Sequence, residues 1–196
     1  MQRRAMTETV RTDLVALQDA FDAAERDAGA LVADLGEEPG TWRAEPTSWS
    51  VAECLDHLAT ANRVYLRAME PAGERALVRG RLRRGPAEPG LIGRLVVRSF
   101  EPPVKRFLRL RAPKRIRPRA GPGLADAAGA FVASQEEIRA FLRRYGEIDL
   151  AGVTFPNPFI RGVRFSLATG LHILAAHERR HLVQAARAKQ AALRPR

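Results

Sequence analysis

The chain has almost no cysteine, since Cys54 is the only one in 196 residues. A disulfide within the chain is therefore excluded. The first residues, MQRRAMTETVRTDL, lack the apolar core of a signal peptide. No stretch near the C-terminal motif approaches the ~20 apolar residues of a membrane span. We expect a cytoplasmic protein that does not cross a membrane.

Alternation of apolar and polar residues is also scarce, and no run is long enough to predict a sheet. Apolar residues instead recur at helical spacing in four segments, separated by connectors rich in Gly and Pro. They predict helices over about residues 7–35, 51–69 and 124–145, and a fourth from about 166. Ser50 and Glu53 form a capping-box pattern before the second helix. The sequence predicts an all-α fold in a single domain over residues 1–196.

Acidic residues are scarce in one stretch. Residues 75–119 hold 15 Lys or Arg but only two acids, Glu88 and Glu101, so this stretch carries a net charge of 15 − 2 = +13. The whole chain carries a net charge of +11. The rest of the chain therefore carries 11 − 13 = −2. Such a segment can bind nucleic-acid phosphates, but it has almost no aromatic residues to stack on bases. We expect at most weak, sequence-independent nucleic-acid binding; the alternative is a solvated surface or the interface of a homodimer.

The C-terminal segment reads LHILAAHERRHLVQAARAK, in which HERRH fits the H-E-x-x-H pattern of zinc peptidases. His177 and His181 lie four residues apart on a predicted helix, so both can face one ion. Two unrelated core or surface histidines would give the same spacing. Common zinc peptidases take a third ligand after this helix, but LVQAARAKQAALRPR contains no His, Asp or Glu. The pattern disfavours a peptidase, and any third ligand must come from upstream.

Two histidines lie upstream. His172 falls on the opposite face of the last helix from His177 and His181, which predicts a surface residue. His57 lies near the apolar face of the second helix, in SWSVAECLDHLATANRVYL. Two facing helices of a bundle can build a metal site from such residues. Taken alone, His57 is more typical of a hydrogen-bonded core residue than of a metal ligand.

Two stretches resemble the DinB/YfiT-like family of four-helix-bundle metalloenzymes, which is unrelated in fold to the DNA polymerase that shares the name. WSVAECLDHLATANRVYL is similar to the family's second helix, which begins at a tryptophan and carries a ligand histidine. LHILAAHERRHLVQ is similar to its H-x-x-x-H-x-x-Q helix. The resemblance implies an up-down four-helix bundle in which His57, His177 and His181 bind one metal ion. Residues 71–119 are then an enlarged basic insertion between the second and third core helices.

Three neutral imidazoles leave a coordination position open, as catalytic metal sites do. Zinc is the expected divalent ion, and nickel, iron or manganese also suit histidine ligands. The resemblance further implies enzymes that use low-molecular-weight thiols. We expect a metal-dependent hydrolase or thiol transferase acting on a small molecule. A non-catalytic metal-binding or ligand-binding bundle and a nucleic-acid-binding protein are the alternatives.

The other polar residues near these motifs have weaker signals, and none is assigned as catalytic. Cys54 is expected to be a small core residue and Glu53 a capping partner. Glu178 is expected to pair with a nearby arginine. Gln184 and Asp56 are candidates for hydrogen bonds that orient the site.

Overall fold

The structure, a computed structural model, describes residues 2–102 and 113–194, with side chains from residue 12 onward. Its helices are α1 (Gln2–Val32), α2 (Glu37–Thr41), α3 (Val51–Val78), α4 (Leu91–Phe100), α5 (Leu124–Tyr145) and α6 (Leu167–Ala192), with a short 3-10 helix η2 (Lys114–Ile116). β1 (Thr154–Pro156) and β2 (Arg164–Ser166) form a small antiparallel hairpin. The described part has no helix long and apolar enough to cross a membrane. The prediction of a mainly helical chain is confirmed.

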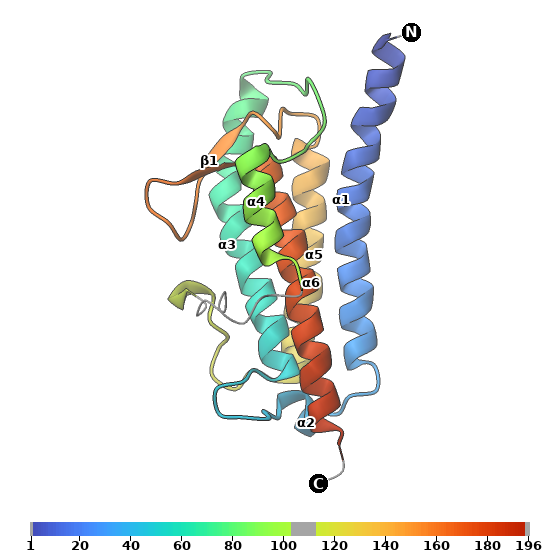
Figure 1. The fold of residues 1–196 in the computed structure, drawn as a ribbon, viewed down its shortest axis with the longest axis vertical. Helices are drawn as coiled ribbons and strands as arrows, with labels where there is room; N and C mark the ends of the chain where they lie inside the picture. The colour runs from blue at the N-terminus through green and yellow to red at the C-terminus, as the bar shows by residue number, and fades with distance from the viewer. Residues whose placement is uncertain (1, 103–112, 195–196) are drawn as a thin grey trace.

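The four long helices, α1, α3, α5 and α6, pack side by side (Figure 1). They correspond to the four segments predicted from apolar spacing. The largest difference is in α3, which continues to Val78 instead of ending near residue 69. Pro71 lies inside the helix, but Ala72 and Ala76 beyond it are buried in the main core cluster. Burial of this last third of the helix outweighs the backbone hydrogen bond that proline removes.

The directions of the helices differ from the predicted up-down order. α3 and α5 run the same way (Figure 1). Asn62 contacts Ser134 midway along the pair, and Gly73 lies under the ring of Tyr145 near the ends of both helices. Short loops make neighbouring helices antiparallel, whereas the connection over residues 79–123 is long enough to return the chain to the other end of the bundle. The simple up-down order was therefore wrong.

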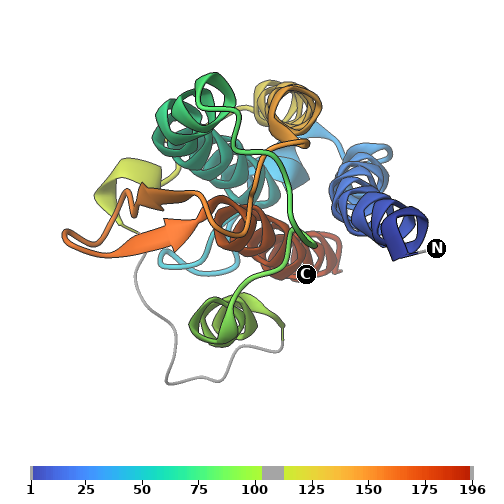
Figure 2. The same cartoon turned by 90° about the horizontal axis from the view of Figure 1, so that it is seen from above.

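This long connection holds most of the basic segment. It starts at residue 79 rather than 71, because residues 71–78 belong to α3. Residues 103–112, which the sequence also places in the segment, lie outside the described part. Figure 2 shows α4 outside the bundle, against α6. There Gly93 approaches Thr169 so closely that a Cβ on Gly93 would lie 2.5 Å from the Thr169 hydroxyl.

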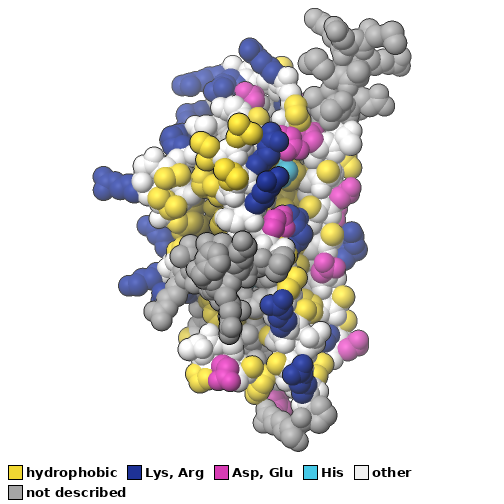
Figure 3. All heavy atoms as spheres, viewed as in Figure 1, with side chains coloured by type: hydrophobic (Ala, Val, Ile, Leu, Met, Phe, Trp, Pro, Cys, Tyr) yellow, Lys and Arg dark blue, Asp and Glu magenta, His cyan; other side chains and the backbone are white. Residues whose placement is uncertain are grey.

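The outer face of α4 is apolar. Leu91, Ile92 and Leu95 are 79%, 78% and 65% exposed. Figure 3 shows hydrophobic side chains gathered over this part of the surface, with Lys and Arg side chains around them. The opposite face of α4 carries Val96 and Phe100, which pack against the core.

The β1–β2 hairpin was not predicted, because each strand has only three residues. The Asn157 side-chain oxygen forms its turn by accepting the backbone N–H groups of Phe159 and Ile160, at 2.7 and 2.9 Å. Phe155 of β1 is fully buried against Gly170, where there is no room for a Cβ. The hairpin is thereby fixed over the start of α6.

Candidate metal centre

The start of α3 is set by the capping box that the sequence predicted. The Ser50 hydroxyl accepts the Glu53 N–H at 3.2 Å, and the Glu53 carboxylate accepts the Ser50 N–H at 3.0 Å. Arg43 forms a salt bridge with the same carboxylate. The role of Glu53 as a capping partner is confirmed. With the helix start fixed in this way, His57 faces the bundle interior two turns later.

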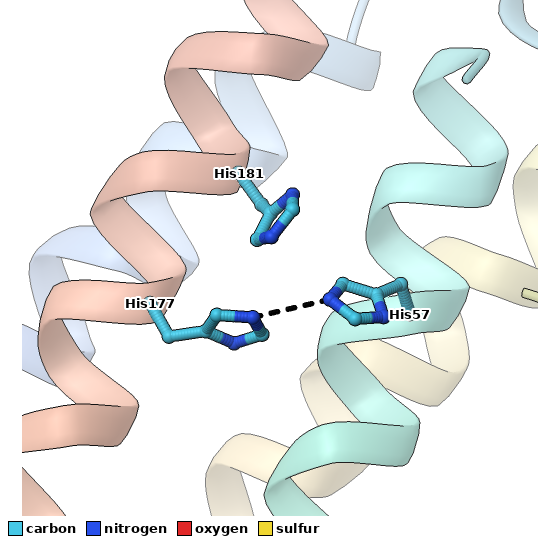
Figure 4. Close-up of side chains that lie close together, drawn as sticks. All are labelled: His57, His177 and His181. Atoms are coloured by element: carbon cyan, nitrogen blue, oxygen red, sulfur yellow. Dashed lines mark hydrogen bonds between the residues drawn. The ribbon is translucent and has the colours of Figure 1, made fainter. Parts of the chain in front are cut away.

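The start of α6 is fixed in a similar way. The Ser166 hydroxyl accepts the Thr169 N–H at 3.1 Å, which caps the first turn. His177 and His181 follow on the face of α6 turned toward α3, and each is only 8% exposed. Because residues four apart lie on one face of a helix, both imidazoles point toward His57 (Figure 4).

The structure brings together the three histidines that the sequence singled out. Nε2 of His57 lies 3.1 Å from Nε2 of His177. The ring centroid of His181 lies 4.5 Å from that of His57 and 4.6 Å from that of His177. One ring nitrogen from each histidine can be chosen so that all three lie within 4.8 Å of one another.

The hydrogen bonding of His57 determines which of its nitrogens is available as a ligand. Nδ1 contacts the backbone carbonyl oxygen of Ile116, which can only accept, so Nδ1 carries the proton. The neutral ring then presents the lone pair of Nε2 to the other two histidines. Ile116 belongs to η2, so the basic segment supplies the group that orients His57.

These nitrogens fit a divalent ion. Zinc–nitrogen bonds of about 2.0–2.1 Å in a tetrahedral site place two ligand nitrogens about 3.3 Å apart, close to the 3.1 Å between His57 and His177. Nδ1 of His181 is buried and has no hydrogen-bond partner in the described part of the chain. A buried polar atom of this kind normally has a partner, so the described chain leaves hydrogen-bonding or ligating capacity on His181 unused.

All three histidines are neutral at pH 7. Burial lowers the pKa of His57 to about 4, with the positive charge of Arg180 also lowering it. Burial, followed by the neighbouring His57 and Arg180, lowers the pKa of His181 to about 3. Burial, followed by the neighbouring His181, His57 and Arg180, holds the pKa of His177 well below 6.5. The neutral imidazole is the form that binds a metal, so protons do not compete for the site near neutral pH.

The remaining candidates are placed as follows. Cys54 is fully buried in a core cluster, where burial raises the pKa of its thiol, and it is not among the described residues that line the cavity beside the histidines. Asp56 accepts the backbone N–H of Arg119 at 2.8 Å and its Nε at 2.7 Å, so it holds the basic segment. Gln184 lines the cavity beside His181. His172 is half-buried, with Nε2 3.1 Å from the Ala87 carbonyl oxygen.

The expectation for Glu178 was wrong. Glu178 is fully buried and has no ion pair with a described arginine. Its carboxylate accepts the side-chain amides of Asn62 and Gln135, each at 2.8 Å. The next residue, Arg179, points outward and pairs with Glu101. Each residue turns the helix by about 100°, which places Glu178 against α3 and α5. Asn62 and Gln135 were not recognised in the sequence, although both are polar residues on helix faces otherwise filled with apolar side chains.

A cavity of about 1250 Å³ opens beside the three histidines. Trp49 packs against His57 and His181, with ring centroids 4.7 and 5.5 Å away, and Phe100 packs against His177 at 5.9 Å. Other walls come from α3, α6, the β1–β2 hairpin and residues 113–120. The histidines therefore lie at the wall of a space large enough for a small molecule.

The fold and the site define a class of protein, a helical bundle with a buried cluster of three histidines on two facing helices. A family model described as the DinB superfamily matches residues 20–185. The match includes both helices that carry the histidines, so the chain belongs to the DinB superfamily, as its two sequence motifs predicted. No curated protein and no solved structure gives a significant match.

Proposed function

We propose that this protein is a metal-dependent enzyme that acts on a small molecule, with His57, His177 and His181 as the metal ligands. The observation that carries the proposal is the convergence of three buried, neutral imidazoles at the wall of a cavity of about 1250 Å³. A purely structural histidine cluster would not need such a space beside it. Zinc is the ion that we expect, and nickel, iron and manganese are the alternatives.

Such an ion, when bound, would supply a Lewis acid and make a water or thiol nucleophilic at neutral pH. The chain's own residues prepare the site. The Ile116 carbonyl orients His57 through Nδ1. Trp49 and Phe100 shield the histidines from solvent. Hydrolysis and transfer of a low-molecular-weight thiol are the two reactions that suit this arrangement, and we expect one of them.

The geometry argues against a peptidase. A peptidase of the H-E-x-x-H type uses the glutamate as a general base within reach of the substrate. Glu178 instead faces the core and is bonded to Asn62 and Gln135. It is not among the described residues that line the cavity. The site therefore suits a small molecule rather than a peptide strand.

Metal analysis of protein purified without a histidine tag tests this proposal. Wild type should hold about one divalent ion per chain, and replacing His57, His177 or His181 by Ala should each reduce that stoichiometry. His172→Ala is the matched control, since His172 lies on α6 but bonds the Ala87 carbonyl instead. Full metal occupancy in His57→Ala would remove the basis for the three-histidine site.

Activity is then screened on the same preparations, with hydrolysis and thiol-transfer substrates, before and after metal removal. Turnover that is lost with the metal and restored by adding it supports an enzyme. Metal binding without any turnover would favour the alternative, a non-catalytic metal-binding bundle. We also expect a cytoplasmic protein and a homodimer, and light scattering would test the second.

A further inference from the structure

The cavity beside the histidines differs in character at its two ends. The described residues that line it include five arginines and two glutamates. Arg187 lies beyond His181 on α6, and Arg43, Glu45 and Glu53 belong to the segment around the start of α3, which is at the same end because α3 and α6 run in opposite directions. Resting on the proposed function, we propose that the substrate is an elongated organic anion. Its apolar body occupies one arm of the cavity, and its carboxylate or phosphate group binds in the other arm, beside Arg187.

The apolar arm begins one turn before His177. Ile173 and Leu174 of α6 line it, and because α3 runs the opposite way, Ala61 and Tyr65 lie at the same level. Tyr65 packs on Phe159 of the hairpin, with ring centroids 5.7 Å apart. The other apolar lining residues of this arm are Val96, Phe100, Pro102, Ile160 and Phe165. None of these side chains is charged, so this arm suits a hydrocarbon or aromatic group.

The cationic arm lies beyond His181. Gln184 and Arg187 follow His181 along α6, nearly one and two turns later, and both line the cavity. Arg187 is exposed and forms no ion pair with a described residue. The distance from Leu174 to Arg187 along the helix is about 20 Å, at about 1.5 Å per residue. A ligand that touches both ends must therefore be elongated.

The charges of the cationic arm do not cancel one another. The five lining arginines and two lining glutamates sum to 5 − 2 = +3, and Asp56, which pairs with Arg119 without lining the cavity, reduces this to 3 − 1 = +2. Arg43 is paired with Glu53, and Arg119 is paired with Asp56. Arg180 also lines the cavity, directly before His181 on α6. A positive field therefore extends from the mouth of this arm to the histidines, and it favours an anionic group over a neutral one.

Calorimetric titration of the full chain tests the proposal, with and without Zn²⁺. The probes are 8-phenyloctanoate, its neutral analogue 8-phenyloctanol, and butyrate, which has the charge but only a short apolar part. 8-Phenyloctanoate should bind at least about tenfold more tightly than either of the others, because only it fills both arms. Arg187→Gln should lower the affinity for 8-phenyloctanoate by about tenfold, which is the effect of losing one charge-assisted hydrogen bond. The affinity for 8-phenyloctanol should not change.

Arg67→Gln is the matched control, because Arg67 is exposed on α3 and is not among the residues that line the cavity. Equal affinities for 8-phenyloctanoate and 8-phenyloctanol would overturn the proposal. So would an affinity for 8-phenyloctanoate that requires Zn²⁺ but does not respond to Arg187→Gln, since the carboxylate would then bind the metal. Because the titration is repeated without metal, failure of this inference is separate from failure of the three-histidine metal site, which the metal analysis of His57→Ala decides.

Discussion

Replacing Glu178 by glutamine should stabilise the fold, although Glu178 occupies the general-base position of the H-E-x-x-H pattern. One carboxylate oxygen of Glu178 accepts the amides of Asn62 and Gln135. The other carboxylate oxygen, Asn62 Oδ1 and Gln135 Oε1 are buried without a hydrogen-bond partner in the described part of the chain. A glutamine keeps the shape and the acceptor, and its amide adds a donor for one of these oxygens.

The size of the effect follows from the pKa of Glu178, which burial raises from 4.5 to about 8. Between pH 4.5 and about 8, Glu178 keeps its proton in the folded state and loses it in the unfolded state. The free energy of unfolding therefore falls as pH rises through this interval. The interval is 8 − 4.5 = 3.5 pH units. At about 1.4 kcal/mol per unit, the loss is about 5 kcal/mol at pH 8 and above. Glutamine does not ionise and escapes this loss, so Glu178→Gln should gain several kcal/mol at pH 8 and little at pH 4.5.

Urea denaturation of wild type and Glu178→Gln at both pH values measures this difference, with metal content determined in parallel. Glu70→Gln on α3 is the control, since Glu70 is exposed, and it should change stability by less than about 0.5 kcal/mol at either pH. Metal content should be unchanged in Glu178→Gln. A variant that is less stable at pH 8 would refute the reasoning. Metal-dependent proteolysis by wild type that disappears in the variant, with metal still bound, would restore the peptidase interpretation.

Two further predictions concern pH and the basic segment. Without metal, the contribution of buried His57 to the free energy of unfolding should be at its full value above pH 6.5 and fall as the pH drops toward 4, because its pKa is about 4 and the unfolded chain takes up its proton first. The difference in free energy of unfolding between wild type and His57→Gln, from denaturation curves at pH 7 and 5, isolates this contribution; a difference that does not change with pH would contradict the assignment. Binding to duplex or single-stranded DNA should be weak and decline steeply with salt. Clear sequence preference in a mobility-shift assay near physiological salt would favour the nucleic-acid alternative.

Much of the site could be predicted from the sequence because its elements are local. The capping box fixes where α3 begins, and the four-residue spacing places His177 and His181 on one face of α6. Apolar periodicity likewise identified the four long helices. Each of these signals depends on residues within two turns of one another, so a single sequence contains it.

The parts that were missed depend on distant contacts. The parallel arrangement of α3 and α5 is set by a long connection, whose path no local pattern determines. The acceptor for His57 is a backbone carbonyl, and a backbone group has no signature in residue types. Glu178 was assigned to an arginine because its neighbours in sequence are basic, whereas its actual partners lie on α3 and α5. Pairing of charges along the chain is a poor guide once a side chain turns into the core.

The contacts of the basic segment with α3 give part of its positive charge a structural role. Asp56 and His57 are neighbours on α3, and both hold this segment, Asp56 through Arg119 and His57 through the Ile116 carbonyl. Asp56 is almost fully buried, and a buried carboxylate is stable only when it is paired and hydrogen-bonded. Arg119 supplies both a guanidinium and a backbone N–H. The contact that orients His57 therefore depends on a cation in the segment next to it, and the basic residues of this segment nearest the site, Arg117 and Arg119, line the cavity.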